Sequence, residues 1–347
     1  MEKPSARRIV NSVAPMRICD LGGWTDTWFA GHGCICNLSV YPHAEVQMRI
    51  VGRDDQPDRI IIHAENFSDR YGIDLPGGVY DKHPLLEAAL DYMGIPDELA
   101  LDVSIYSECP AGASTGTSAA VSVALIGALD CLTPGRMTPH EVALAAHKIE
   151  TELLKQQCGI QDQVASAYGG ISYIDMFDYP RCAVSHVKIS DTLWWELESR
   201  IALVFVGQPH SSSKVHEMVI RSLEEAGPEA PALQPLRRAA REGCDALYAE
   251  DLRVFGQVMQ RNTEAQRQLN ENLISPGHQQ IIDLAAEYNA WGWKVNGAGG
   301  DGGSVTILAG PDRTVRRKML DQIIQAGFSV VPVTLSPYGL RIWETTV

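Results

Sequence analysis

Alternating and apolar stretches over the first 131 residues predict a mixture of strands and helices. An amphipathic segment at 83–94 closes with Gly94, so we expect a helix there. Residues 118–131 are almost wholly apolar and predict a buried helix. Segments rich in β-branched residues, or alternating between apolar and polar positions, predict three strands: 35–51, 58–66 and 100–109.

Helical patterns dominate the rest of the chain. Thr138 is followed three positions later by Glu141, a capping signature, and the pattern predicts one long helix over 138–159. Helices also fill most of 213–290. Strands are expected at 169–175, 200–207, 304–310 and 328–335, with a helix at 313–327 between the last two.

This strand–helix–strand ending favours a second, small α+β domain. The chain has 347 residues, which is long for one domain. We therefore expect an N-terminal domain over 1–195 and a C-terminal domain over 196–347, with the boundary near the segment 188–200.

Composition and charge exclude several classes of partner. The chain is 45% hydrophobic and 21% charged, which is typical of a globular protein in water. Its net charge of −14 argues against binding to nucleic acid or to an anionic membrane, because the overall field would repel both. A nucleotide remains possible, since Mg²⁺ and backbone N–H groups supply local positive potential.

Targeting signals and cysteines point to the cytoplasm. The N-terminal residues contain no apolar stretch of signal-peptide length. The longest apolar run, 119–129, is about half of the roughly 20 residues that a membrane span needs. The eight cysteines are scattered, and Cys34 and Cys36 are expected to be buried thiols rather than metal ligands.

A run of small residues, PAGASTGTSAA at 110–120, precedes the apolar helix. Gly112 and Gly116 let the backbone approach a ligand, and the hydroxyls can bond phosphate oxygens or Mg²⁺. A helix N-terminus binds anions through its unpaired N–H groups. The spacing matches neither a Walker A loop nor a dinucleotide fingerprint, so these residues alone fit either a tight turn or a phosphate site.

Two further segments place carboxylates among glycines. In APMRICDLGGWTDT, residues 14–27, Asp26 lies near Trp24; this pair suits sugar hydroxyls and C–H groups, but Asp26 could equally cap a backbone N–H. In GIQDQVASAYGG, residues 159–170, Asp162 lies between two glutamines with no Lys or Arg close in sequence. It could serve as a general base or as a cap.

These three segments, together with NGAGGDGG at 296–303, resemble the GHMP kinases, whose three signature motifs occur in this order. PAGASTGTSAA is similar to the nucleotide loop P-x-x-x-G-L-G-S-S-A-A, and NGAGGDGG to the C-terminal glycine motif G-A-G-G-G-G. Within the family, GGWTDT and GIQDQ…AYGG are most similar to the anomeric sugar kinases, namely L-fucokinase and D-glycero-D-manno-heptose 7-phosphate kinase.

The resemblance implies a two-domain α+β fold, with an N-terminal domain like ribosomal protein S5 domain 2 and a ferredoxin-like C-terminal domain. It implies an ATP- and Mg²⁺-dependent phosphotransferase that is a monomer or homodimer and acts on a small sugar or sugar phosphate. We expect phosphorylation of the anomeric C1 hydroxyl of a pyranose, either a heptose of the 7-phosphate type or L-fucose. A galactokinase-like kinase and a non-catalytic sugar- and ATP-binding regulator are the alternatives.

The resemblance also assigns roles to residues. Asp162 corresponds to the base that takes the proton from the sugar hydroxyl, and Arg17 to the cation beside it. Ser118 and Glu150 correspond to the Mg²⁺ ligands, although a helical Glu is more often solvated. The remaining expected contacts are Gly23, Trp24, Thr25 and Asp26 for the sugar; Pro110, Gly112, Ser114, Thr115, Gly116, Thr117 and Ser118 for ATP; and Gly297, Gly299 and Gly300 for the wall beside the phosphates.

Some positions depart from the family pattern or are less defined. Ser114 and Thr115 replace the usual Gly-Leu, so the loop should be stiffer. Asp301 replaces a glycine, and we expect it to point outwards because a carboxylate repels a triphosphate. Residues 83–90 could line an adenine pocket, and the cluster His210–Lys214 could face a ligand or cap a helix.

Three rival functions fit less well. A regulator would be expected to lack Asp162, Glu150 or Ser118, yet all three are present. A decarboxylase of the mevalonate branch should have basic residues where GGWTDT stands. A dinucleotide oxidoreductase should open a βαβ unit with its glycine run, whereas the run at 297–303 lies near the C-terminus and follows no predicted strand.

Overall fold

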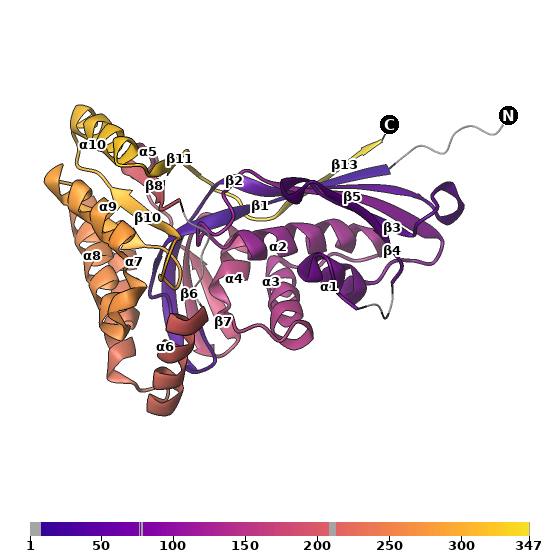
Figure 1. Ribbon diagram of the computed structural model, residues 1–347, viewed down its shortest axis with the longest axis horizontal. Coiled ribbons are helices and arrows are strands. Elements are labelled where there is room, and N and C mark those ends of the chain that lie inside the picture. The colour runs from indigo at the N-terminus through magenta and orange to yellow at the C-terminus, as the bar shows by residue number, and fades with distance from the viewer. Residues whose placement is uncertain (1–7, 76, 78, 208–212, 347) are drawn as a thin grey trace.

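The fold is described by a computed structural model covering residues 8–75, 77, 79–207 and 213–346. This part of the chain contains one nine-stranded and one four-stranded sheet. The larger sheet and the four helices that cover it form the long unit in Figure 1. The smaller sheet and the later helices lie at the left end of this unit in that view. No helix in the described ranges combines the length and apolarity that a membrane crossing requires.

The larger sheet is organised around β2, which spans Gly33–Gly52. Along its first half, Gly33–Leu38, β2 pairs with β6, and along its second half, Ala44–Gly52, it pairs with β5. Its other edge pairs with β1. The remaining members are β1 (Arg8–Leu21), β3 (Ile60–Ala64), β4 (Asp69–Ile73), β5 (Leu99–Ser107), β6 (Ile171–Asp178), β7 (Arg181–His186), β12 (Thr334–Leu335) and β13 (Arg341–Thr346).

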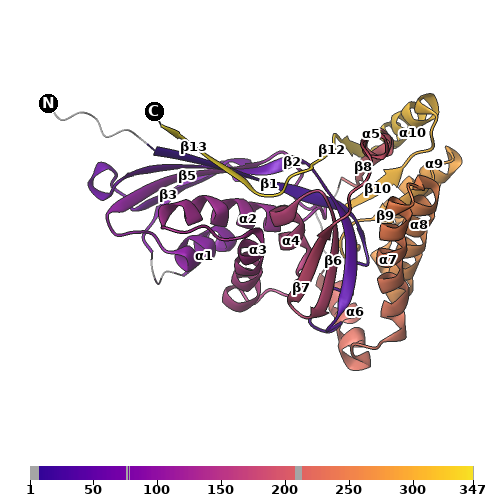
Figure 2. The same cartoon turned by 180° about the vertical axis from the view of Figure 1, so that it is seen from behind.

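Four helices cover one face of this sheet (Figures 1 and 2): α1 (Pro84–Met93), α2 (Thr117–Leu129), α3 (Pro139–Lys148) and α4 (Gln161–Tyr168). The apolar α2 packs on β1 and β2 and is flanked by the other three helices. Because it is enclosed on every side, it needs no polar face, which confirms the prediction of a buried helix.

The prediction of one helix over 138–159 is wrong beyond its first half. The expected capping box is present, since Thr138 Oγ1 accepts from Glu141 N at 3.3 Å and Glu141 Oε2 accepts from Thr138 N at 2.7 Å. The helix α3 then gives way to a π-helical turn, Ile149–Leu153. The polar residues that follow have no apolar face to bury, and the chain turns at Lys155, where φ is 55°.

The second unit has the strand order β11-β8-β10-β9, entirely antiparallel. With helices between β8 and β9 and between β10 and β11, this is a ferredoxin-like arrangement and confirms the two-domain α+β fold class. Its elements are β8 (Ile201–Phe205), β9 (Gly292–Val295), β10 (Ser304–Leu308), β11 (Ser329–Val331), α5 (Asp191–Arg200), α6 (Ser213–Ala226), α7 (Gln234–Tyr248), α8 (Leu252–Leu269), α9 (Pro276–Glu287) and α10 (Arg313–Gln325).

The chain returns to the first sheet at its C-terminal end. The expected strand 328–335 divides, because β11 joins the small sheet whereas β12 pairs with β2. The following β13 pairs with β1, from Arg8 opposite Thr346 to Val13 opposite Arg341. A division of the chain at residue 195 stays a prediction; it falls within α5, and residues 334–346 belong to the first sheet.

Candidate active site

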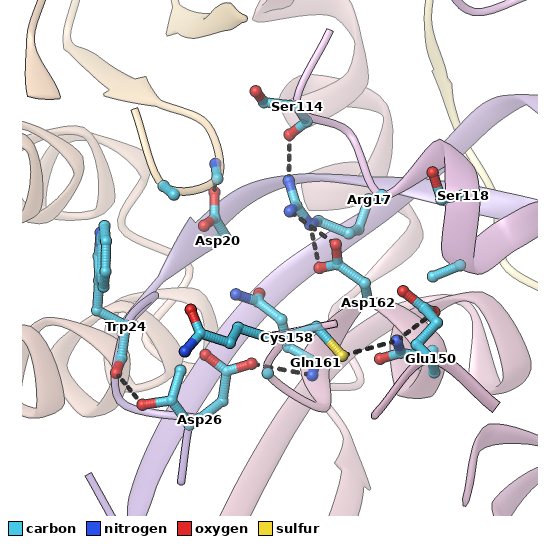
Figure 3. A pocket seen from close by; sticks show the side chains of 18 of the residues that line it. Arg17, Asp20, Trp24, Asp26, Ser114, Ser118, Glu150, Cys158, Gln161 and Asp162 are labelled. Atoms are coloured by element: carbon cyan, nitrogen blue, oxygen red, sulfur yellow. Dashed lines mark hydrogen bonds and ion pairs between the residues drawn. The ribbon is translucent and has the colours of Figure 1, made fainter. Parts of the chain in front are cut away.

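The polar segments singled out in the sequence meet around one cavity of about 490 Å³. Its described walls come from the end of β1, the turn before α2, the start of α4, helix α6 and the loop after β9. In Figure 3, Arg17 and Asp162 point toward one another in the middle. Ser118 and Glu150 lie on one side of this pair and Asp20, Trp24 and Asp26 on the other. We call these sides the nucleotide half and the acceptor half.

Arg17 and Asp162 form a bidentate ion pair at the centre of the cavity. Arg17 Nε donates to Asp162 Oδ1 at 2.8 Å, and Nη2 donates to Oδ2 at 3.1 Å. Arg17 Nη1 donates to the carbonyl of Ser114. Burial alone would lower the pKa of Arg17, but the nearby charges of Asp162 and Asp20 raise it above its ordinary value. The guanidinium is therefore charged, and it holds the Asp162 carboxyl through two hydrogen bonds.

The nucleotide half is a turn built mainly from backbone. Gly112, Ser114 and Gly116 have φ angles of 79°, 56° and 71°, so the backbone is left-handed at alternate positions. Gly116 is the N-cap of α2, and no side chain bonds to the first N–H groups of that helix. A Cβ atom added at Gly116 would lie 3.2 Å from Asp162 Cγ, so the acid contacts this turn directly.

The C-terminal glycine loop closes over the same turn. A Cβ atom at Gly297 would lie 3.1 Å from Ser114 Cβ, and one at Gly303 would lie 2.8 Å from Ser114 Oγ. Side chains at these two positions would push the loop away from the turn. Asp301 is exposed and does not line the cavity, as expected. The loop joins antiparallel β9 and β10, which is a hairpin and not the βαβ unit of a dinucleotide site.

Asp26 accepts a backbone N–H, which is one of the two roles that its sequence left open; the sugar contact stays a prediction. It lines the acceptor half and is buried, and its Oδ2 accepts from Gln161 N at 3.0 Å at the start of α4. A Cβ atom at Gly159 would lie 2.0 Å from this oxygen, so glycine is required there. Burial raises the pKa of Asp26 to about 6. The carboxyl thus fixes the α4 N-terminus, which carries Asp162, and also faces the cavity.

Aromatic residues form the outer wall of the acceptor half. Trp24 and Phe29 are buried with ring centroids 6.3 Å apart, and Trp28 meets Phe29 edge-on at 5.0 Å. Helix α6 adds Ile220 and His216, whose ring lies 5.6 Å from that of Trp24 at 83°. Rings and a branched alkyl group suit the C–H face of a sugar.

A buried ion pair forms the floor beneath Arg17. Lys294, 1% exposed, lies 3.4 Å from Oδ1 of Asp20, which is fully buried. Lys294 also donates to Gln266 Oε1 at 3.2 Å and to the carbonyl of Val295. Asp20 Oδ1 additionally accepts from Gly297 N at 3.1 Å. The pair therefore joins β1 of the first sheet to β9 and the glycine loop of the second.

Glu150, in the π-helical turn after α3, and Ser118, in the first turn of α2, both line the nucleotide half. Glu150 lies in the π-helical turn, is buried, and accepts from Gln163 Nε2 at 2.8 Å through Oε1. Burial raises the pKa of Glu150 to about 7, so a nearby cation would favour its ionised form. Nowhere in the described residues do three His, Cys, Asp or Glu side chains gather as a metal site, Cys34 and Cys36 included.

A second cavity of about 330 Å³ adjoins the nucleotide turn. It shares Gly112, Thr117 and Ser118 with the first cavity. Its other described walls are largely apolar and include four residues of the segment 83–90, namely His83, Pro84, Leu85 and Leu86. A flat apolar ring attached to a phosphate chain would fit such a pair of neighbouring cavities.

Some predicted site residues do not line either cavity. Gly23 and Thr25 support the turn after β1, since Gly23 abuts Asp20 and Thr25 Oγ1 donates to Gly22 O at 2.8 Å. Pro110, Gly299 and Gly300 are also absent from the described walls. In the cluster His210–Lys214, residues 210–212 lie outside the described residues, as do the side chains of 213 and 214.

Residues that the sequence analysis did not assign include Asp20, Lys294, Gln163, His216 and Trp28. Lys294 carried one usable signal, because a lysine inside the apolar strand Gly292–Val295 must be buried and therefore paired. The others have no local signal. Asp20 and Lys294 are 274 residues apart in the chain, so their pairing depends on the whole fold.

Comparisons with known proteins agree with this geometry. The family model described as "GHMP kinases N terminal domain" matches residues 83–170. A mevalonate kinase of Thermococcus sibiricus is 31% identical over 69% of this chain and 68% of its own. A D-glycero-alpha-D-manno-heptose 7-phosphate kinase of Campylobacter jejuni is 24% identical over 97% and 99%. A bifunctional fucokinase/GDP-fucose pyrophosphorylase of Arabidopsis thaliana is 26% identical over 84% of this chain and 29% of its own.

Solved structures show the same fold. The crystal structure of a D-glycero-D-manno-heptose 1-phosphate kinase of Bacteroides thetaiotaomicron superimposes with a TM-score of 0.73 at 21% identity. The match covers 96% of this chain and 98% of that one, so it includes both units.

Proposed function

Because this chain belongs to the GHMP kinase family, a family of phosphotransferases with alcohol acceptors, we propose that it transfers the γ-phosphoryl group of ATP to the anomeric hydroxyl of a pyranose. The acceptor is a sugar of the kind named for two relatives, a heptose or L-fucose. The observation that carries the proposal is the contact of Asp162 with both Arg17 and Gly116, between the two halves of the cavity.

The nucleotide half fits the triphosphate of ATP. The uncapped N–H groups at the start of α2 and the left-handed turn before it offer donors to phosphate oxygens. No acidic residue lies in the first turn of α2 to repel an anion. The adjoining apolar cavity beside residues 83–86 holds the adenine ring.

The nucleotide half also fits Mg²⁺. The Ser118 hydroxyl and the Glu150 carboxylate are the oxygen ligands, and two protein ligands suffice because Mg²⁺ keeps waters and substrate phosphates in its shell. The ion, when bound, neutralises charge on the phosphates. The buried Glu150 carboxyl supports this assignment, since burial without a cation raises its pKa to about 7.

In the reaction, the chain positions the acceptor and handles one proton. Asp26 and the aromatic wall hold the sugar so that its C1 hydroxyl faces Asp162. As the C1 oxygen bonds to the γ-phosphorus and the bond to the leaving oxygen of ADP breaks, the proton of the C1 hydroxyl passes to Asp162. Arg17 orients Asp162 through its two hydrogen bonds and stabilises negative charge on the transferred group.

The test is a product screen by ³¹P NMR with ATP and Mg²⁺ and no nicotinamide. The panel contains D-glycero-D-manno-heptose, its 7-phosphate, L-fucose, D-galactose and mevalonate. We expect a sugar 1-phosphate as the product. Phosphorylation of mevalonate alone, or of a sugar at another carbon, would contradict the proposal. ATP binding without turnover across the panel would instead favour the regulator.

A further inference from the structure

The charges that line the acceptor half bear on the kind of sugar it accepts. Its described acidic residues are Asp20 and Asp26, beside polar residues such as Thr27, Gln161 and His216, and the neighbouring Asp162 and Glu150 add two more carboxylates. Among the described lining residues, Arg17 is the one Lys or Arg. The cavity is therefore negative before any nucleotide enters, and a triphosphate adds further negative charge.

Neither buried cation can serve a second phosphate group. Arg17 donates to Asp162 and to Ser114 O at the centre of the cavity, and in the proposed function its remaining N–H groups serve the transferred phosphoryl group. Lys294 does not line the cavity and donates to Asp20, Gln266 and Val295. Taking either away from its partner would leave a buried carboxylate uncompensated, which is strongly unfavourable.

One part of the wall beside Trp24 is apolar. Trp28, Phe29 and Ile220 line it, and Trp28 Nε1 is held by Glu224 Oε1 at 2.7 Å. That bond fixes the indole ring and adds a carboxylate near the rim. A phosphate or carboxylate on the non-reacting end of an acceptor would lose its hydration here without gaining a cation.

From these three observations we propose that the acceptor is an uncharged pyranose, whose non-reacting end packs on Trp28, Phe29 and Ile220, and not a sugar phosphate or another anion. The inference rests on the proposed function and narrows it, because it selects L-fucose or an unphosphorylated heptose over heptose 7-phosphate.

The experiment compares D-glycero-D-manno-heptose with its 7-phosphate, and L-fucose with mevalonate. Turnover is measured with ATP and Mg²⁺, and binding is measured by calorimetry with a non-hydrolysable ATP analogue. We expect kcat/KM and affinity to favour the uncharged member of the heptose pair about tenfold or more, because like charges a few ångströms apart repel by more than the ~1.4 kcal/mol that a tenfold ratio represents.

A charge variant makes the comparison sharper. Ile220→Lys adds a cation to the apolar wall and should improve kcat/KM for heptose 7-phosphate at least severalfold, while that for the uncharged heptose falls. Met218→Lys is the matched control, since Met218 lies on the same helix, is 60% exposed and does not line the cavity. It should leave both values near those of the parent protein.

The outcomes distinguish failure of this inference from failure of the proposed function. If heptose 7-phosphate or mevalonate reacts or binds better than the uncharged sugars, the inference is overturned, although phosphorylation of C1 would still support the proposed function. If uncharged sugars bind better but none is phosphorylated, the inference stands and the proposed function fails. If no sugar binds or reacts, both are overturned.

Discussion

The two halves of the cavity are built from different parts of the polypeptide. The nucleotide half is built mainly from one stretch, the turn of small residues at 112–119 that leads into α2, with Glu150 beside it. The acceptor half is a set of side chains from β1, the loop after it and α6. Backbone donors suit a ligand shared by a whole family, whereas side chains can change from member to member and select the acceptor.

The largest expected effect lies where the halves meet. Asp162→Asn removes the proton acceptor, and we expect kcat to fall about 10²- to 10⁴-fold while ATP affinity changes little. Turnover and nucleotide binding are measured separately. Asp175→Asn, at an exposed position of β6, is the control and should leave both unchanged. Unchanged turnover in Asp162→Asn would remove this residue from the mechanism.

The second prediction concerns the floor of the acceptor half. Lys294→Met leaves the Asp20 carboxylate buried and unpaired, so the free energy of unfolding should fall by about 3–5 kcal/mol in urea titrations. Arg261→Met breaks a surface pair with Glu242 and should cost about 1 kcal/mol or less. Equal losses of unfolding free energy in the two variants would show that the buried pair stabilises the fold no more than the surface pair does.

The third prediction uses the raised pKa of Asp26. Burial raises this pKa from its ordinary 3.8 to about 6, so between these values the folded protein keeps a proton that the unfolded chain has lost. The free energy of unfolding should therefore fall as pH rises through this window, by on the order of 2–3 kcal/mol. In Asp26→Asn the fall should be smaller by that amount. If the free energy of unfolding changed with pH in the same way in both proteins, the raised pKa of the buried Asp26 carboxyl would be refuted.

The smallest effect tests the nucleotide half. Gly116→Ala forces a left-handed residue to carry a Cβ atom, at roughly 1–2 kcal/mol, and presses it against Asp162. We expect the KM for ATP to rise about 5- to 30-fold. Gly135→Ala is the control, because Gly135 has a φ of 97° with nothing within 4 Å of the added atom. A similar rise in KM in the control would mean that strain in the fold, and not the contact, is responsible.

The difference between the two halves also explains which parts of the site could be predicted from the sequence. The nucleotide turn is local, so its small residues and the apolar helix behind it were recognisable as a unit, and the order of the motifs indicated the family. The acceptor half depends on residues far apart in the chain, such as Asp20 with Lys294 and Trp24 with His216. No spacing rule reports such pairs before the fold is known.

The fold shows the same division. Strands with clear alternation and the amphipathic helix α1 were predicted near their observed ends, because their patterns are local. The prediction of a helix over 138–159 runs past the end of α3, because no local pattern indicates the π-helical turn that carries Glu150. The partition of 328–335 between two sheets is not predictable either, since only two residues separate β11 from β12 in a continuous strand-like segment, and only tertiary pairing assigns them to different sheets.

The pairing of β13 with β1 has a consequence for biosynthesis. The edge of β1 opposite β2 has no partner until residues 341–346 have left the ribosome, more than 300 residues after β1 itself was made. Until then the nascent chain exposes a bare strand edge that could join another polypeptide. Completion of the first sheet is therefore a late event, which waits for the synthesis of residues 341–346.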